Sequence, residues 1–264
     1  MARIKEMFVD DYIVCDIETT GLSAEYDHII EIAALKVNNG TVTETFSTLV
    51  KPPVHISREI TALTGINDDM VSDAPDISSA IKDYVAFIGE LPLLGHNFNR
   101  FDRRFLQKQA EIKNTCLDTL EIARHIRNNA SGCSLSALCT SFGIVNDNAH
   151  RAVSDCIATD QVYKKLRELY SENGGYIEMA VTCTRTEYQK NISSYCPPNT
   201  ALDYEMDKDG NIIFFADRYP IGILSGLKKQ VFYEYLSDIT GVMASRVEVN
   251  AKGKYLLGVE ISVK

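Results

Sequence analysis

Several absences limit what this chain of 264 residues can be. No apolar run approaches the ~18–20 residues that a helix needs to span a bilayer, and the amino terminus is charged where a signal peptide would be apolar. The chain also contains no low-complexity segment and no internal repeat. These features predict a folded cytoplasmic protein, whose length fits one large domain or two smaller ones.

The cysteines form no recognisable site. There are seven, an odd number, and none is part of a C-x-x-C pair. Such spacing suits neither a zinc site nor a disulfide framework. Cys15 and Cys156 lie inside apolar runs, where cysteine packs as a small hydrophobic residue. We therefore expect reduced thiols in the core.

Basic residues are scarce, with 27 Lys and Arg against 36 Asp and Glu and a net charge of -9. This balance argues against a non-specific nucleic-acid coat protein, because such proteins are usually basic. It does not exclude an enzyme that acts on nucleic acid, since the charge of a carboxylate-rich metal site is cancelled by the bound cations.

The first part of the chain begins with β-rich segments joined by short turns. Residues 12–18, 28–37 and 41–50 read as three strands, and Asn38-Asn39-Gly40 is a hairpin signal between the last two. These strands should form an antiparallel unit. Two further short strands are expected at 91–95 and 115–118.

Helical periodicity then alternates with the short strands. Asp76 and Ser134 are expected to cap two of the helices. Helices are predicted at 57–63, 77–88, 101–110, 119–126, 135–142 and 152–170. Strands followed by alternating strands and helices favour an α/β fold, a mixed sheet of five strands flanked by helices.

A boundary is predicted where Ser171 to Gly175 forms a flexible stretch, dividing the chain into a domain at 1–172 and a small α+β domain at 173–264. Residues 193–200 are another irregular segment. In the second domain we expect hairpins at 201–216 and 245–263, a strand at 220–226 and a helix at 227–239.

Asp16 and Glu18 are the first chemistry-bearing residues. They stand two apart in an apolar strand, so both carboxylates project from the same face. Two acids in such a strand are costly unless a cation offsets them, and hard Mg²⁺ or Mn²⁺ is the natural partner. The alternative is that the strand end is exposed and both acids are hydrated.

Three further residues have both a functional and an ordinary explanation. Asp102 lies in a first helical turn, where it could simply interact with the helix dipole. His150 ends the polar loop Asn146–His150, where a histidine can move to deprotonate water as a general base. Asp155 follows in the next helix among apolar neighbours. Taken alone, these two residues could be a surface histidine and an ordinary acid of a first helical turn.

Taken together, three segments resemble a known family. The pieces D-I-E-T-T-G-L, G-H-N-x-x-x-F-D and H-R-A-x-x-D resemble the three motifs of the DEDDh, or DnaQ-like, 3′→5′ exonucleases, which have an RNase H-like fold. The resemblance covers about residues 10–170, and this part of the chain is similar to the proofreading exonuclease of bacterial DNA polymerase III. Histidine five positions before Asp155 indicates the His subclass. The second motif is one residue longer here than in many members of the family. The additional residue lies around Asn99-Arg100, in a turn where insertion is tolerated.

The resemblance implies a two-metal hydrolysis of phosphodiester bonds that releases 5′-mononucleotides from the 3′ end of DNA, in proofreading or repair. It implies that Asp16, Glu18 and Asp155 hold one Mg²⁺ or Mn²⁺, that Asp16 and Asp102 hold the second, and that His150 is the general base. It also implies substrate contacts by residues in three loops: Thr19, Thr20, Gly21, Leu22, Leu63, Thr64, His96, Asn97 and Phe101. For Leu22, Leu63 and Phe101 the alternative is plain core packing. Glu31, inside an apolar strand, is either a supporting group or a buried acid bonded to the backbone.

Other functions are compatible with these motifs. The enzyme could trim RNA instead of DNA, and a phosphatase for small nucleotides would need a closed pocket. A module that binds nucleic acid or a DNA polymerase, or another replication or repair protein, is an alternative of a different class. Residues 221–260 distantly resemble a BRCT-like module, although the chain lacks the tryptophan expected there.

Overall fold

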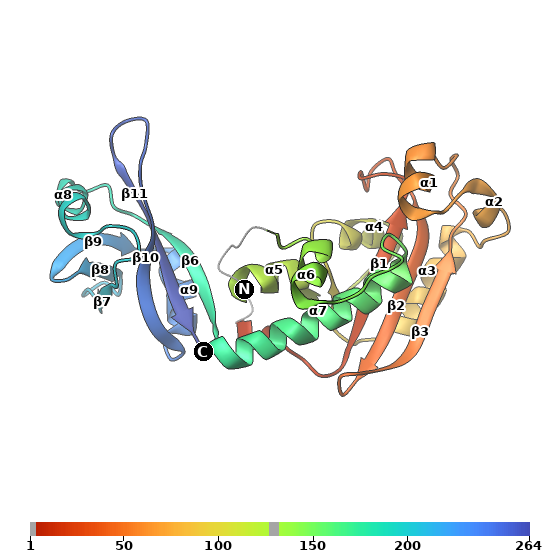
Figure 1. The fold of residues 1–264 in the computed structure, drawn as a ribbon, viewed down its shortest axis with the longest axis horizontal. Helices are drawn as coiled ribbons and strands as arrows, with labels where there is room; N and C mark the ends of the chain where they lie inside the picture. Colours follow the sequence, from red (N-terminus) through yellow and green to blue (C-terminus); the bar gives the residue numbers. More distant parts are fainter. Residues whose placement is uncertain (1–3, 127–131) are drawn as a thin grey trace. The chain divides into compact units, whose positions relative to one another are not determined.

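The structure is a computed structural model that describes residues 4–126 and 132–264. These residues form two compact units, each drawn in Figure 1. The N-terminal unit contains residues 7–124 and 132–168, and the C-terminal unit contains residues 4–6, 125–126 and 169–264. Within the described ranges, none of the helices is both long enough and apolar enough to cross a membrane.

The N-terminal unit is built on a mixed sheet with the strand order β3-β2-β1-β4-β5. Its strands are β1 (Tyr12–Thr19), β2 (Ile29–Asn38), β3 (Thr41–Leu49), β4 (Leu93–Gly95) and β5 (Cys116–Asp118). β2 pairs antiparallel with β1 and with β3, whereas β4 runs parallel to β1 and β5. The predicted five-stranded mixed sheet flanked by helices is therefore confirmed.

Local signals in the sequence fix the helices around this sheet. Ser57, Asp76 and Ser134 each accept a hydrogen bond from a backbone N–H in the first turn of the helix that follows. Gly65 and Gly143 end their helices in the left-handed conformation that glycine adopts readily. The helices are α1 (Arg58–Thr64), α2 (Asp68–Val71), α3 (Ile77–Ile88), α4 (Asp102–Gln109), α5 (Thr119–Ile126), α6 (Leu135–Phe142) and α7 (Ala152–Asn173), with a 3-10 helix at Ile4–Met7.

The central strand β1 buries both of its faces. Ile13, Cys15 and Ile17 belong to one core cluster with residues of α3 and α4, and the Tyr84 hydroxyl of α3 donates to Cys15 Sγ at 3.1 Å. On the opposite face the Tyr12 hydroxyl donates to Asp160 Oδ1 of α7 at 2.8 Å, and α7 crosses this face in Figure 1. A polar side chain on β1 is therefore sheltered unless it lies at the strand end.

The C-terminal unit contains two antiparallel sheets of three strands, β10-β11-β6 and β7-β8-β9. Isolated bridges join them: Thr182 pairs with Ile223 of β9, and Ala201 pairs with Met243 of β10. The six strands therefore form a closed ring of hydrogen-bonded neighbours. The elements are β6 (Gly175–Val181), α8 (Thr186–Tyr195), β7 (Asp203–Met206), β8 (Ile212–Ala216), β9 (Tyr219–Leu224), α9 (Leu227–Tyr235), β10 (Ile239–Val249) and β11 (Tyr255–Val263).

Some predictions for this part of the chain were wrong. Ser171 to Gly175 is not a flexible stretch, because α7 continues to Asn173 and β6 begins at Gly175. Gly174, at a φ of 73°, makes this abrupt change from helix to strand in a single residue. Ser193 to Tyr195 belong to α8, and α9 ends at Tyr235, before the predicted position 239.

The predicted hairpins of the C-terminal unit are present, since β7 pairs with β8 and β10 pairs with β11. The expected order strand-helix-strand-strand is also found in β9, α9, β10 and β11. However, β9 belongs to a different sheet from β10 and β11, and this division gives no support to a BRCT-like module. As expected, five of the seven cysteines are buried: Cys15, Cys139, Cys156, Cys183 and Cys196.

Candidate active site

A pocket of about 430 Å³ lies where β1 and β4 end. Parallel neighbours bring their carboxyl ends to one edge of a sheet, where the following loops form a crevice. The pocket is lined by all five residues predicted to carry the chemistry, Asp16, Glu18, Asp102, His150 and Asp155. Segments far apart in the sequence thus meet at one place.

Asp16 and Glu18 enter the pocket from β1. They occupy alternate positions of the strand, which places both carboxylates on the face covered by α7. Glu18 is only 9% exposed, although it lies one residue from the end of the strand. The alternative that both acids are simply hydrated at an exposed strand end does not hold for Glu18.

Asp102 comes from the first turn of α4 and is 4% exposed. Its Oδ1 accepts a hydrogen bond from the Ile17 backbone N–H at 3.2 Å, so this acid is tied to the strand between Asp16 and Glu18. The additional residue around Asn99-Arg100 does not remove Asp102 from the pocket. It is accommodated in the turn that precedes α4.

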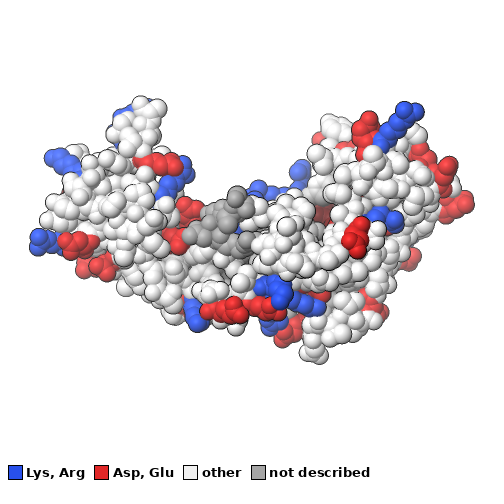
Figure 2. Space-filling model, in the orientation of Figure 1, with Lys and Arg blue, Asp and Glu red and all other residues white. Residues whose placement is uncertain are grey.

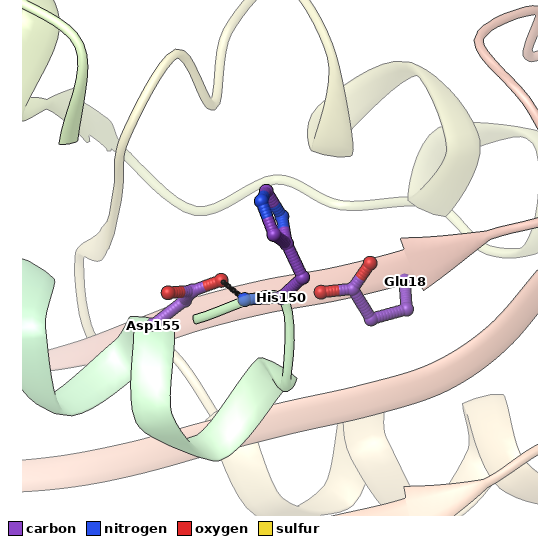
Figure 3. A group of neighbouring side chains, drawn as sticks. All are labelled: Glu18, His150 and Asp155. Carbon is purple, nitrogen blue, oxygen red and sulfur yellow. Dashed lines mark hydrogen bonds between the residues drawn. The ribbon is translucent and has the colours of Figure 1, made fainter. Parts of the chain in front are cut away.

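His150 and Asp155 come from the start of α7. The His150 backbone N–H donates to Asp155 Oδ2 at 2.9 Å, and Asn146 Nδ2 donates to Oδ1 of the same carboxylate at 2.7 Å. His150 is exposed and adopts a left-handed backbone with a φ of 65°. In Figure 3 His150 stands between Asp155 and Glu18, and its imidazole points upward from the level of their carboxylates.

Two supporting residues were not identified as site residues from the sequence. Glu31 of β2 lies directly opposite Glu18 in the register of the two strands, and its side chain is 3% exposed. Arg151 donates to Glu31 from Nε at 3.2 Å and from Nη2 at 2.8 Å, and the Ala152 N–H donates to the same carboxylate at 3.0 Å. The turn that carries His150 is therefore bound to the sheet that carries Glu18.

Burial shifts the acid–base equilibria of the carboxylates. It raises the pKa of Glu18 to about 8, and the neighbouring Asp155 carboxylate adds to the shift. It raises the pKa of Asp102 to about 7, against the effect of the backbone N–H groups that bind this carboxylate. The pKa of Asp16 is also raised, by burial and then by the charge of Asp102. Each shift shows that negative charge here is unfavourable without a cation.

The chemistry of these side chains fits a divalent metal ion. One ligand atom each from Glu18, His150 and Asp155 lie within 4.8 Å of one another. Asp16 and Asp102 add carboxylate oxygens to the same pocket. Oxygen-rich sites of this kind suit hard cations such as Mg²⁺ or Mn²⁺.

Most residues predicted to contact substrate also line the pocket: Thr19, Gly21, Leu22, Leu63, Thr64, His96, Asn97 and Phe101. Leu22 is 86% exposed and Leu63 is 51% exposed, so neither is a core residue as the alternative interpretation required. Ile17 and Ile60 line the pocket too and were not predicted. Thr20 does not line the pocket. Its hydroxyl oxygen accepts a hydrogen bond from the His28 N–H at 3.0 Å, which joins the two ends of the loop that contains Leu22.

The turn after β4 is held by an acid outside the pocket. Asp118 accepts hydrogen bonds from the N–H groups of Asn97 at 2.9 Å and Leu120 at 3.0 Å. His96 Nδ1 lies 2.9 Å from Thr119 Oγ1, and burial lowers the pKa of this histidine to about 4. His96 is therefore neutral at ordinary pH and offers a polar group without adding charge.

Comparison with known proteins agrees with this arrangement. Residues 13–163 match the family described as Exonuclease. The DNA polymerase III PolC-type protein of Caldanaerobacter subterraneus subsp. tengcongensis is 40% identical over 169 residues, and the Bacillus subtilis protein of the same name is 40% identical over 172. Each match covers 62% of this chain and 12% of the relative, so the chain spans only a small part of these proteins.

Two solved structures share the fold. Exonuclease X in complex with 5′ overhanging duplex DNA is 28% identical, with a TM-score of 0.50 over 62% of this chain and 93% of that one. E. coli Exonuclease I in complex with a dT13 oligonucleotide has a TM-score of 0.54 over 78% of this chain and 51% of that one. At 16% identity the latter is a likeness of fold alone.

Proposed function

The chain belongs to the exonuclease family, and on that premise we propose that it hydrolyses DNA from the 3′ end and releases 5′-mononucleotides. Membership of this family confirms the prediction of a nuclease, a phosphodiester hydrolase. The observation that supports the finer proposal is the pocket in which four acidic side chains and His150 meet beside the exposed Leu22 and Leu63.

In this proposal the carboxylates hold two divalent cations. Asp16, Glu18 and Asp155 would hold one, and Asp16 and Asp102 would hold the other. Bound cations supply positive charge against the phosphate and make water a stronger nucleophile at neutral pH. The raised pKa values of Glu18 and Asp102 support this role, because a nearby cation favours the ionised form that burial opposes.

His150 is proposed to accept the proton of the attacking water at an imidazole nitrogen. The water oxygen then bonds to phosphorus, and the bond between phosphorus and the 3′ oxygen breaks. The 3′ oxygen stays on the shortened strand and takes up a proton, and a 5′-mononucleotide leaves. His150 is suited to this because its backbone is anchored to Asp155 while its side chain remains exposed at the pocket. The anchor holds the base near the carboxylates without burying it.

The remaining pocket residues would select a strand end. Gly21 leaves room for the Asp27 carboxylate, which accepts from the Ser23 N–H at 2.8 Å and so shapes the loop that exposes Leu22. Leu22 and Phe101 offer apolar surface to a sugar or base, and contacts of this kind are tolerant of sequence. Thr19, Thr64, His96 and Asn97 add polar groups to the same wall.

DNA is proposed as the substrate because both solved structures described above contain DNA, as their names state. The PolC-type relatives further suggest work beside a DNA polymerase or another replication or repair protein. Residues 1–172 are proposed as the exonuclease domain, and residues 173–264 as an accessory domain that positions substrate or a partner. Removal of residues 175–264 should then weaken binding but spare the hydrolysis of short oligonucleotides.

One digestion assay tests the function. The protein, with Mg²⁺ or Mn²⁺, is given single-stranded DNA, duplex DNA and RNA, each labelled at the 5′ end, beside an Asp16→Ala control. We expect progressive shortening of single-stranded DNA from the 3′ end, and none with the control. Shortening of RNA alone would identify an exoribonuclease. No shortening of any substrate would overturn the proposal.

A further inference from the structure

A row of basic side chains follows α4 beside the pocket. Arg104 and Lys108 are four residues apart on this helix, and positions four apart lie on one helix face. Arg100 stands four residues before Arg104, in the turn that leads into α4. All three side chains are exposed.

One end of this row adjoins the pocket, and the other contacts the loop that carries Leu22. Phe101, next to Arg100, lines the pocket, and its ring packs on Phe105 with a centroid separation of 5.2 Å. At the other end, Lys108 Nζ donates to the backbone oxygens of Ala24 at 3.0 Å and Glu25 at 2.8 Å, in the loop that presents Leu22. The row therefore runs between the pocket and the loop that carries Leu22.

Among the residues that the structure describes, the two arginines of the row have no acidic partner. Across residues 4–126 and 132–264, the side chains of Arg100 and Arg104 take part in none of the hydrogen bonds or ion pairs. The acid between them in sequence, Asp102, is buried and accepts from the Ile17 N–H instead. By contrast, Arg151 and Arg167 each pair with a carboxylate.

Folding stability does not explain such a row. Like charges four apart on a helix repel each other, and the chain has acidic residues in excess with which its cations could pair. Acidic and basic groups are intermixed over the face drawn in Figure 2. Two arginines without an acidic partner, next to a carboxylate-lined pocket, are, however, what a polyanion would need in order to approach it.

We propose that Arg100 and Arg104 bind backbone phosphates of a single DNA strand, on the 5′ side of the nucleotide that occupies the pocket. This inference rests on the proposed function and adds the path of the strand to it. Guanidinium groups suit phosphate because their planar donors bind two oxygens at once. Lys108 continues the positive row and holds the Leu22 loop in place.

The test compares two double variants that change the net charge equally. In Arg100→Gln/Arg104→Gln, the row variant, both arginines of the row are removed and Lys108 is kept. In the control, Lys113→Gln/Lys165→Gln, two exposed lysines away from the pocket are removed, each paired with a surface glutamate. KM and kcat are measured on a long single-stranded oligonucleotide over a range of salt concentrations.

For the row variant we expect a KM about tenfold higher with kcat unchanged, because about 1.4 kcal/mol of lost phosphate binding corresponds to a tenfold change. The log–log salt dependence of kcat/KM should become shallower by about 1.4, or about 0.7 for each of two lost contacts on a single strand. The nitrophenyl ester of thymidine 5′-monophosphate, which is too short to reach the row, should be cleaved normally.

Two outcomes would overturn the inference: an unchanged salt dependence in the row variant, or an equal change in the lysine control. Equal loss on the nitrophenyl ester would place the defect in the pocket and also reject it. Binding of a labelled strand, measured by fluorescence anisotropy in an Asp16→Asn background, separates the two proposals. If binding depends on Arg100 and Arg104 but the wild-type protein cleaves no substrate, the proposed function is overturned and the inference about the arginines stands.

Discussion

Arg151, the residue after the proposed base His150, forms a two-point ion pair with Glu31 across 120 residues of sequence. Glu31 lies opposite Glu18 on the neighbouring strand, and the charge of Arg151 offsets part of the repulsion between the two acids. Because Arg151 lies between His150 and Ala152, the ion pair fixes the turn at which the loop becomes α7. Arg151 takes no part in the proposed hydrolysis, but its ion pair fixes the position of the residue proposed to act as the base.

This relationship predicts that Arg151 acts through His150. Arg151→Ala should lower kcat about 10- to 100-fold with KM little changed, since a small displacement of a reacting group costs rates of this order. In a His150→Ala background the same change should have no further effect. The measurement is single-turnover hydrolysis by wild type, both single variants and the double variant. The matched control is Arg167→Ala, which breaks the ion pair between Arg167 of α7 and Asp10. Additive losses would contradict the prediction.

Replacement of His150 should separate catalysis from metal binding. Since general bases contribute about 10²–10⁴-fold, we expect His150→Ala to lose a rate of that order while it still binds Mn²⁺. The rate is followed with labelled single-stranded DNA, and metal binding by calorimetry. The control His55→Ala removes an exposed histidine that contacts Asp68 on the surface. Loss of Mn²⁺ affinity in His150→Ala would instead identify His150 as a metal ligand.

The metal-free protein should become less stable as pH rises. The pKa of Glu18 is raised from 4.5 to about 8 by folding, so the folded state holds this proton more tightly than the unfolded state does. Its stabilising contribution is complete below 4.5 and is lost as pH approaches 8. Thermal unfolding in a chelator, followed across this range, measures the effect.

In the same experiment Glu18→Gln should show a flatter dependence on pH, because the substituted residue does not titrate. Glu44→Gln, which removes an exposed carboxylate on β3, should behave as wild type. Addition of Mn²⁺ should restore the stability of the wild type near pH 8 and do so less in Glu18→Gln. A melting temperature of the metal-free wild type that is constant with pH would contradict the assignment.

Leu22 should matter for binding and not for folding. Its side chain is 86% exposed, so Leu22→Ala removes little packing and should leave the melting temperature unchanged. If the leucine contacts the terminal base, KM should rise by a factor equivalent to about 1–2 kcal/mol, since each buried CH₂ group contributes about 0.8 kcal/mol. Leu227→Ala, which truncates a leucine 79% exposed in the C-terminal unit, is the control. A normal KM in Leu22→Ala would remove this residue from the substrate site.

Local signals made much of the N-terminal unit predictable. Asp76 and Ser134 cap the helices expected of them, and the alternation around Asp16 and Glu18 placed both acids on one face. The segments that carry Asp102 and Asp155 were recognised because they resemble motifs of a known family. These features depend on neighbours in sequence or on a short motif, and both are visible without coordinates.

Long-range pairing was not predictable in this way. From the sequence, Glu31 could be either a supporting group or a buried acid bonded to the backbone. The choice stayed open because the sequence does not show that Arg151 forms an ion pair with it. The run Ser171 to Gly175 was rich in residues typical of turns, yet burial of the neighbouring Leu166 and Tyr176 keeps helix and strand regular up to Gly174. The closing contacts Thr182–Ile223 and Ala201–Met243 are single bridges without a sequence signature.

The ring of strands in the C-terminal unit has its own consequence. Its first and last strands are neighbours, and Gly175 is the register partner of Val263. A unit whose two ends lie side by side can be inserted into another chain, or circularly permuted, with little disturbance to its interior. Because their ends are adjacent, residues 175–263 could be joined as one unit to a different nuclease.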